Sequence, residues 1–147
     1  MFEGDSGSGN VFKFDAAGTK STAVSGLNQP NGVAVDRLGN LFVSDNGAND
    51  IFKYTPGGVQ STFATGLDGP SGLAFDSSGN LFDADNTGGN VYEFTPGGVR
   101  TTFATGISPL GLAFAPVTAP GTPEPGSLAL ATGVILSGIW VRRRRRN

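Results

Sequence analysis

Residues 30–67 read PNGVAVDRLGNLFVSDNGANDIFKYTPGGVQSTFATGL, and the same stretch returns at residues 70–107 as PSGLAFDSSGNLFDADNTGGNVYEFTPGGVRTTFATGI. The period is 40 residues, and 20 of the 38 aligned pairs are identical. A repeat of this size is typical of a stacked-repeat or propeller architecture. The repeated stretch therefore predicts the fold class before any single residue is considered.

Each unit contains four short apolar or alternating segments that are separated by polar turns. In the first copy these segments cover residues 32–36, 40–45, 51–54 and 59–65. They are rich in β-branched and aromatic side chains, and the turns between them use the Asp, Asn, Pro and Gly residues that tight turns favour. Four strands in about 40 residues is the size of one propeller blade. We therefore predict an all-β fold, an incomplete β-propeller, over residues 1–115.

The repeat is incomplete at both ends. Residues 1–5 align with residues 41–45, in the middle of a unit, and a third copy begins near Gly106 and breaks off after Phe114. We expect about two and a half blades, fewer than the roughly four to eight of a closed propeller. Because the chain starts inside a unit and shows no leader-like segment, we also expect that upstream repeats are missing.

The composition excludes several classes of function. The 147 residues include no Cys and no His, which removes disulfides, thiol chemistry and a Ser-His-Asp triad. Residues 1–121 carry a net charge of −6, whereas Arg142–Arg146 add five positive charges at the end. An acidic body argues against nucleic acid as a partner.

The unit resembles the NHL repeat through three segments, Gly32–Asp36, Gly39–Asp45 and Ile51–Tyr54. The second copy shows the same pattern at residues 72–76, 79–85 and 91–94. The resemblance covers residues 1–115 and implies a β-propeller. Similar blades occur in gluconolactonase-like hydrolases, in streptogramin lyase-like enzymes and in interaction modules, so the resemblance leaves the function open.

The C-terminal segment has three parts in a fixed order. A Pro-rich linker at residues 116–125 ends in Pro123, Glu124 and Pro125, an apolar run follows at Leu128–Val141, and the chain closes with Arg142, Arg143, Arg144, Arg145 and Arg146. This order resembles a PEP-CTERM sorting signal, which implies one transmembrane helix and an Arg tail over residues 126–147. The run of 14 residues would span only about 21 Å as a helix, against about 30 Å for the hydrocarbon core. Bilayer thinning and snorkelling Arg side chains would narrow that gap.

The sorting resemblance implies an exported bacterial protein. Its expected partners are an exosortase, which acts near Pro123–Pro125, and the inner membrane, which the helix enters transiently. The Arg cluster would stop transfer and stay cytoplasmic, while the propeller ends in the cell envelope or outside the cell and binds a protein or glycan. Two alternatives stay open: the C-terminal part of a lactonase-like or streptogramin lyase-like metal-dependent enzyme, and a degenerate fragment without a function of its own.

Carboxylates recur with the period. Asp36 and Asp76 begin the D-x-x-G-N turns, and Asp45 and Asp85 end the second strand of each unit. A ligand or catalytic residue has no reason to recur in every unit, so we interpret all four as turn and corner residues that accept backbone N–H bonds. The loops that follow are rich in oxygen ligands, as calcium prefers, but their spacing does not match an EF-hand.

Asp83 breaks the repeat, because its counterpart is Val43. A buried carboxylate without a partner is costly, so we interpret Asp83 as lying at a solvated strand end. The alternative is that Asp83 and Asp85, with Asn86, face the channel of a complete propeller. The resemblance to lactonase-like propellers then makes these three residues weak candidates for a calcium or other divalent metal site. No catalytic residue is identified.

The aromatic side chains also recur with the period. We predict that they pack between blades rather than bind a ligand. They are Phe42, Phe52, Tyr54, Phe82, Tyr92 and Phe94.

Overall fold

A computed structural model describes residues 1–114, 133–136 and 139–142, the last two segments as backbone only. These residues form strands and no helix. The strands are β1 (Phe2–Asp5), β2 (Asn10–Phe14), β3 (Lys20–Val24), β4 (Pro30–Val35), β5 (Leu41–Asp45), β6 (Asp50–Tyr54), β7 (Gln60–Ala64), β8 (Pro70–Phe75), β9 (Leu81–Asp85), β10 (Asn90–Phe94), β11 (Arg100–Thr105), β12 (Leu112–Phe114), β13 (Gly133–Leu136) and β14 (Ile139–Arg142).

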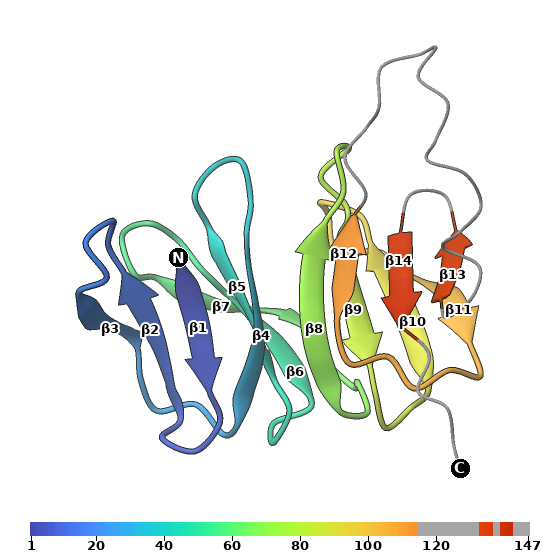
Figure 1. The fold of residues 1–147 in the computed structure, drawn as a ribbon, viewed down its shortest axis with the longest axis horizontal. Helices are drawn as coiled ribbons and strands as arrows, with labels where there is room; N and C mark the ends of the chain where they lie inside the picture. The colour runs from blue at the N-terminus through green and yellow to red at the C-terminus, as the bar shows by residue number, and fades with distance from the viewer. Residues whose placement is uncertain (115–132, 137–138, 143–147) are drawn as a thin grey trace.

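The strands form four antiparallel sheets in the described residues, and the sheets follow the repeat. Blade 1 is β1-β2-β3, blade 2 is β4-β5-β6-β7, blade 3 is β8-β9-β10-β11, and the end sheet is β12-β14-β13. Figure 1 shows blade 1 at one end of the molecule and the end sheet at the other. The prediction of an all-β fold built from four-stranded units is therefore confirmed for blades 2 and 3.

Local turn chemistry sets the strand boundaries. In the D-x-x-G-N turn Gly39 has φ 82°, and in the T-P-G-G turn Gly58 also has φ 82°. Only Gly adopts this left-handed conformation without a steric penalty, so each turn reverses the chain after a fixed number of residues. The counterparts Gly79 and Gly98 have φ 89° and 85°. The same turns in both copies give blades 2 and 3 the same strand register.

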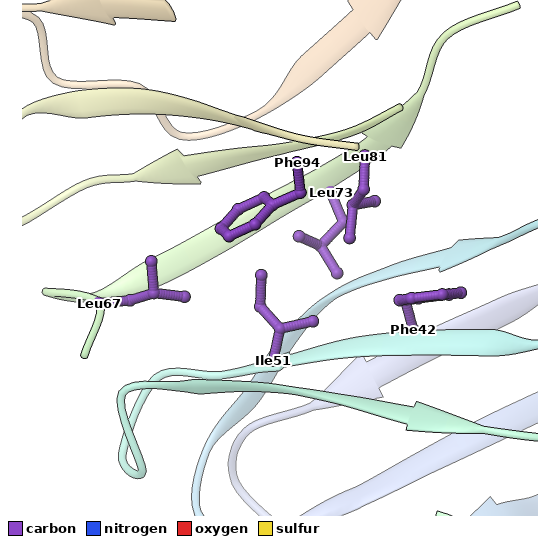
Figure 2. Packing of buried hydrophobic residues seen from close by; sticks show 6 residues of the cluster. All are labelled: Phe42, Ile51, Leu67, Leu73, Leu81 and Phe94. Atoms are coloured by element: carbon purple, nitrogen blue, oxygen red, sulfur yellow. The ribbon is translucent and has the colours of Figure 1, made fainter. Parts of the chain in front are cut away.

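The core lies between the blades. Alternation along β9 sends Leu81 toward blade 2, where it joins Phe42 and Ile51. Figure 2 shows these side chains pointing toward one another from the two facing sheets, together with Leu67, Leu73 and Phe94. The side chains at positions 41 and 43 pack in the same way between blades 1 and 2.

The aromatic prediction is confirmed. Phe42 meets Phe63 and Phe75 edge-on, with ring centroids 5.0 and 5.1 Å apart, at the seam between blades 2 and 3. One period later Phe82 makes the same contacts with Phe103 and Phe114, at 5.3 and 5.1 Å. Edge-to-face aromatic pairs of this kind stabilise by about 0.5–1.5 kcal/mol beyond their buried area.

The C-terminal segment differs from the predicted helix where it is described. Residues 133–136 and 139–142 form β13 and β14, and β14 pairs antiparallel with β12. An open strand edge such as that of β12 presents unpaired N–H and C=O groups, and a β-branched sequence suits pairing with it. Among the residues that the structure describes, no helix has the length and apolar character needed to cross a membrane.

Candidate functional site

The recurring turn carboxylates are occupied by local hydrogen bonds. Asp36 Oδ1 accepts from the backbone N–H groups of Leu38 and Asn40 at 2.9 and 2.8 Å, and Oδ2 accepts from the Asn40 side chain at 2.7 Å. Asp76 repeats this arrangement. Partial burial would raise the pKa of Asp36, but the hydrogen bonds from Asn40 and Leu38 outweigh it and hold the pKa below its usual value. The interpretation of both residues as turn residues is confirmed.

The corner carboxylates join neighbouring blades. Asp45 Oδ2 accepts from the N–H of Asn28 at 2.7 Å, and Asp85 Oδ2 accepts from the N–H of Asp68 at 2.8 Å. In each pair the donor lies in the connection that enters the blade, 17 residues upstream. The other oxygen of Asp85 accepts from the N–H of Gly88 at 3.0 Å. Both carboxylates are buried and satisfied by the backbone, so the structural interpretation is confirmed for them as well.

Asp83 is buried, which corrects the expectation of a solvated strand end. Its side chain is 0% exposed, and neither carboxyl oxygen has a hydrogen-bond partner. It lies on the face of β9 that carries Leu81 and Asp85, so it points into the seam between blades 2 and 3. The repeat places a carboxylate where the preceding seam has Val43. Because the facing blade covers this strand, a position that looks terminal in the sequence has no access to water.

The environment of Asp83 favours its neutral form. Burial, together with the nearby negative charge of Asp85, raises the pKa of the Asp83 carboxyl to about 8. The backbone of Ser71 lowers this pKa slightly, but it does not reach hydrogen-bond geometry with either oxygen. Asp83 is therefore mostly protonated at neutral pH. It differs from Asp85, two residues away, which accepts hydrogen bonds from two backbone N–H groups.

The structure brings Asp83 and Asp85 onto one strand face but does not complete a metal site with them. Both oxygens of Asp85 already accept backbone N–H bonds, and the backbone N–H of Asn86 donates to Gly69 O at 3.0 Å. Within the described ranges, no group of three or more acidic side chains is arranged to hold a metal ion. What the structure shows at this seam is a buried carboxylic acid, Asp83, which can hold a proton.

Sequence reasoning missed a polar network at the same seam. Ser44 Oγ accepts from the N–H of Gly32 at 2.7 Å and donates to the carbonyl of Ser71 at 2.6 Å, which joins the inner strands β4 and β8. Ser71 Oγ in turn donates to Ala84 O at 2.7 Å. The recurrence of Gly32 at Gly72 was the available signal, because an invariant small residue in a strand marks a close backbone approach.

The predicted sorting residues lie almost entirely beyond the described part of the chain. Pro123, Glu124 and Pro125 fall outside it, as do Arg143, Arg144, Arg145 and Arg146. Arg142 is the last residue of β14. The linker at residues 116–125 and the Arg tail therefore remain predictions.

Comparison with known proteins supports the fold. Residues 27–54 match the model of the NHL repeat. A chain of a nidogen–laminin complex is 26% identical with a TM-score of 0.70, and the match covers 78% of this chain and 48% of that one. A streptogramin B lyase is 18% identical with a TM-score of 0.61, covering 73% and 38%. A candidate gluconolactonase is 26% identical with a TM-score of 0.60, covering 72% and 38%.

No curated protein was found to match the chain in sequence. The chain spans less than half the length of each of the three solved structures. The match to the NHL repeat and the similarity to solved propeller-like structures agree with the blades that the described residues form.

Proposed function

We propose that this chain is a propeller-type binding module of the bacterial cell envelope, exported and then sorted through its C-terminal segment by an exosortase. The observation that carries the binding role is the use of the recurring carboxylates. Asp36, Asp76, Asp45 and Asp85 all accept hydrogen bonds from their own turns or from the entering connection. Asp36 and Asp76 thus stabilise their turns, and Asp45 and Asp85 join their blades to the entering connections, which leaves the loops between strands to contact a protein or glycan.

The loops on the Asp45 and Asp85 side suit that role. They are short and polar, residues 46–49 and 86–89, and both follow strands that are buried along their whole length. Rigid strands that carry polar loops form a stable platform for recognition. The similarity to a chain from a nidogen–laminin complex adds support, because that chain was solved in an assembly between proteins.

The export and sorting part of the proposal rests on residue order in the tail. The Pro-Glu-Pro tripeptide, the apolar run Leu128–Val141 and the five Arg residues occur together at the end of the chain. The strand pairing of β14 is compatible with this role. In water the segment satisfies its backbone hydrogen bonds by pairing with another strand, whereas in lipid it would satisfy them by forming a helix.

Deleting residues 128–146 should move the protein from the membrane fraction to the soluble fraction of bacterial cells. The deletion removes the apolar run and the Arg cluster that would hold the chain at the membrane. The measurement is the distribution of the chain after ultracentrifugation, with a variant in which the five Arg residues become Gln as a control for charge alone. An unchanged distribution after the deletion would exclude membrane sorting.

The second candidate is part of a metal-dependent propeller enzyme, lactonase-like or lyase-like. Asp83 favours it, because a buried carboxyl with two unpaired oxygens is often found at functional sites. Asp85 favours the binding module instead. It would have to give up its hydrogen bonds from the backbone N–H groups of Asp68 and Gly88 in order to bind a metal.

Millimolar calcium should leave the melting temperature of the chain unchanged, because Asp83 is sealed from solvent and Asp85 is occupied. The measurement is thermal unfolding with calcium and with chelator, repeated on Asp83→Asn. A calcium-dependent rise that Asp83→Asn abolishes would favour the enzyme.

A further inference from the structure

The antiparallel strands of each blade run between two opposite faces of the molecule. The loop face carries residues 6–9, 46–49 and 86–89 together with the connections that lead from one blade to the next. The turn face carries the hairpin turns, which are residues 15–19, 36–40, 55–59, 76–80 and 95–99. Figure 1 shows the turns after β4 and β8 along one edge of the molecule, the upper one in that view, and β12 ends at the same edge.

The turns of blades 2 and 3 form one continuous surface. A Cβ at Gly39 would lie 3.5 Å from Pro56 Cγ, so the two turns of blade 2 touch each other. A Cβ at Gly79 would lie 3.8 Å from Pro96 Cγ, which gives the same contact in blade 3. Arg37 joins the two blades, because its guanidinium donates a hydrogen bond to Ser77 O. The turn face is therefore a surface made by neighbouring turns and not a set of isolated hairpins.

The charged side chains are divided unequally between the two faces. Within residues 1–114, every basic side chain lies in a hairpin turn or within two residues of one: Lys13, Lys20, Arg37, Lys53 and Arg100. Four acidic side chains share the turn face, which leaves it at 5 − 4 = +1: Asp15, Asp36, Asp76 and Glu93. In the same range the loop face has five acidic side chains and no basic one, a charge of −5: Asp5, Asp45, Asp50, Asp68 and Asp85. A negatively charged surface therefore attracts the turn face and repels the loop face.

Three of the basic side chains of the turn face are exposed. Lys13, Lys20 and Arg37 lie in contact with solvent, and Lys53 is half-buried over the ring of Phe42. Arg100 differs, because it reaches back to the carbonyls of the preceding blade, at Thr65 and Gly66. The acidic side chains beside them are engaged in hydrogen bonds of their own, such as that from Asn80 to Glu93 at 3.0 Å. The exposed cations are therefore available to an anionic partner.

Exposed apolar side chains stand among these cations. Leu38 is 81% exposed at its turn, and Val59 and Val99 are 66% and 63% exposed at theirs. The turns do not require apolar residues there, because the counterpart of Leu38 is Ser78 and the counterpart of Val59 is Thr19. Apolar side chains surrounded by Lys and Arg are the composition of a protein surface that rests on anionic lipid headgroups.

The chain also leaves the blades on this side. β12 runs in the same direction as β8 and ends at Phe114, at the turn face. The Pro-rich linker and the apolar run Leu128–Val141 follow in the sequence. A tail that anchors the chain in a membrane therefore starts from the turn face and holds the loop face away from the lipid.

We propose that the turn face is a membrane-docking surface, which rests on anionic lipid headgroups through Lys13, Lys20 and Arg37 and places Leu38 and Val59 at the headgroup level. The loop face, with its negative charge, then points away from the membrane toward a protein or glycan. The inference rests on the proposed membrane anchoring by the tail and adds to it the orientation of the blades.

Site-specific fluorescence tests this orientation, because the full-length chain has no Cys of its own. Leu38→Cys and Val59→Cys place a fluorophore on the turn face, and Ala48→Cys and Thr87→Cys place one on the loop face. Each labelled chain is reconstituted with vesicles of phosphatidylcholine, with or without phosphatidylglycerol, that carry a nitroxide quencher at the headgroup. With phosphatidylglycerol, quenching at 38 and 59 should be about threefold stronger than at 48 and 87. This excess should fall in about 0.5 M salt, which shortens the range of the attraction.

Paired charge variants in the Val59→Cys chain supply the control. Lys13→Gln with Arg37→Gln removes two cations from the turn face and should lower quenching on phosphatidylglycerol vesicles about twofold. Asp50→Asn with Asp68→Asn removes two charges from the loop face and should leave it unchanged.

Sedimentation of the same samples reports the tail separately from the face. Equal quenching on both faces of a chain that sediments with the vesicles overturns the docking surface and leaves tail anchoring intact. A chain that does not sediment with the vesicles contradicts both. Binding of soluble dextran sulfate by the Val59→Cys chain, without the excess of quenching on vesicles, assigns the turn face to an acidic polymer and also overturns the proposal.

Discussion

Asp83→Val should raise the free energy of unfolding at pH 7 by on the order of 4 kcal/mol. The pKa of Asp83 is about 8 in the folded chain and 3.8 in the unfolded chain. At pH 7 the unfolded chain has released this proton while the folded chain still holds it, and each pKa unit of difference corresponds to about 1.4 kcal/mol. Val at this position restores the side chain that the preceding seam has at Val43, which is fully buried.

The same residue should make the stability of the wild-type chain depend on pH in an unusual direction. Between pH 4 and pH 8 Asp83 is more protonated in the folded state than in the unfolded state, so its contribution to stability is greatest below the unfolded pKa and falls as pH rises toward about 8. The expected slope is at most about 1.4 kcal/mol per pH unit. Because the chain has no His and no Cys, no other side chain ordinarily titrates between pH 5.5 and 8.

Denaturant unfolding at several pH values measures this effect. Asp83→Asn is the matched control, because it keeps a polar side chain but cannot titrate, so the difference between wild type and Asp83→Asn should grow as pH rises from 5 to 8. Asp85→Asn controls for the neighbouring charge and should destabilise, since it weakens the bonds from Asp68 and Gly88. A wild-type stability that is flat over this range relative to Asp83→Asn would show that Asp83 is not buried as an acid.

Gly32→Ala should destabilise the fold by about 3 kcal/mol or more, at the upper end of the range for overpacking. A Cβ at Gly32 would collide with the carbonyl oxygen of Ser71 on the inner strand of blade 3, and would lie 2.8 Å from Leu73 N and 2.9 Å from Ser44 Oγ. These are mainly backbone atoms of the next blade, which cannot move without opening the seam. The collision would also disturb the Gly32–Ser44–Ser71 hydrogen bonds.

Gly57→Ala is the matched control for this prediction. Gly57 lies in a turn with no positive φ, and its nearest neighbour would be Thr55 Oγ1 at 3.8 Å. This substitution should change the unfolding free energy by less than about 1 kcal/mol. Urea midpoints of the two variants compare them directly; equal midpoints would mean that the inner strands do not approach as closely as the structure places them.

The two effects lie at the same seam between blades 2 and 3. Ser71 contributes both its carbonyl, which contacts Ser44 and crowds Gly32, and its backbone, which lies close to Asp83. The seam is therefore tightly packed at the inner strands β4 and β8. On the next strand, β9, it holds the carboxyl group of Asp83, which has no hydrogen-bond partner. We therefore expect substitutions at this seam to change both the stability of the chain and its pH dependence above pH 4.

Much of the fold could be predicted from the repeat. The D-x-x-G-N and T-P-G-G segments specify turns through residues that tolerate their backbone angles, and alternation between those turns specifies strands. The roles of Asp36, Asp45 and their counterparts also followed, because a residue required by every unit recurs in every unit. Turns, strands and turn carboxylates depend mainly on neighbouring residues, so the local sequence is enough to predict them.

The burial of Asp83, the identity of the backbone that Gly32 approaches and the pairing of β14 with β12 could not be predicted from the sequence. Each depends on which surface the next blade covers: Asp83 lies on the covered face of β9, Gly32 meets a carbonyl 39 residues away, and β14 takes an edge left open by β12. Periodicity identifies the faces of a strand but not the partner of each face. The repeat therefore predicts the blades, whereas the packing of one blade on another decides that Asp83 is buried and which backbone Gly32 approaches.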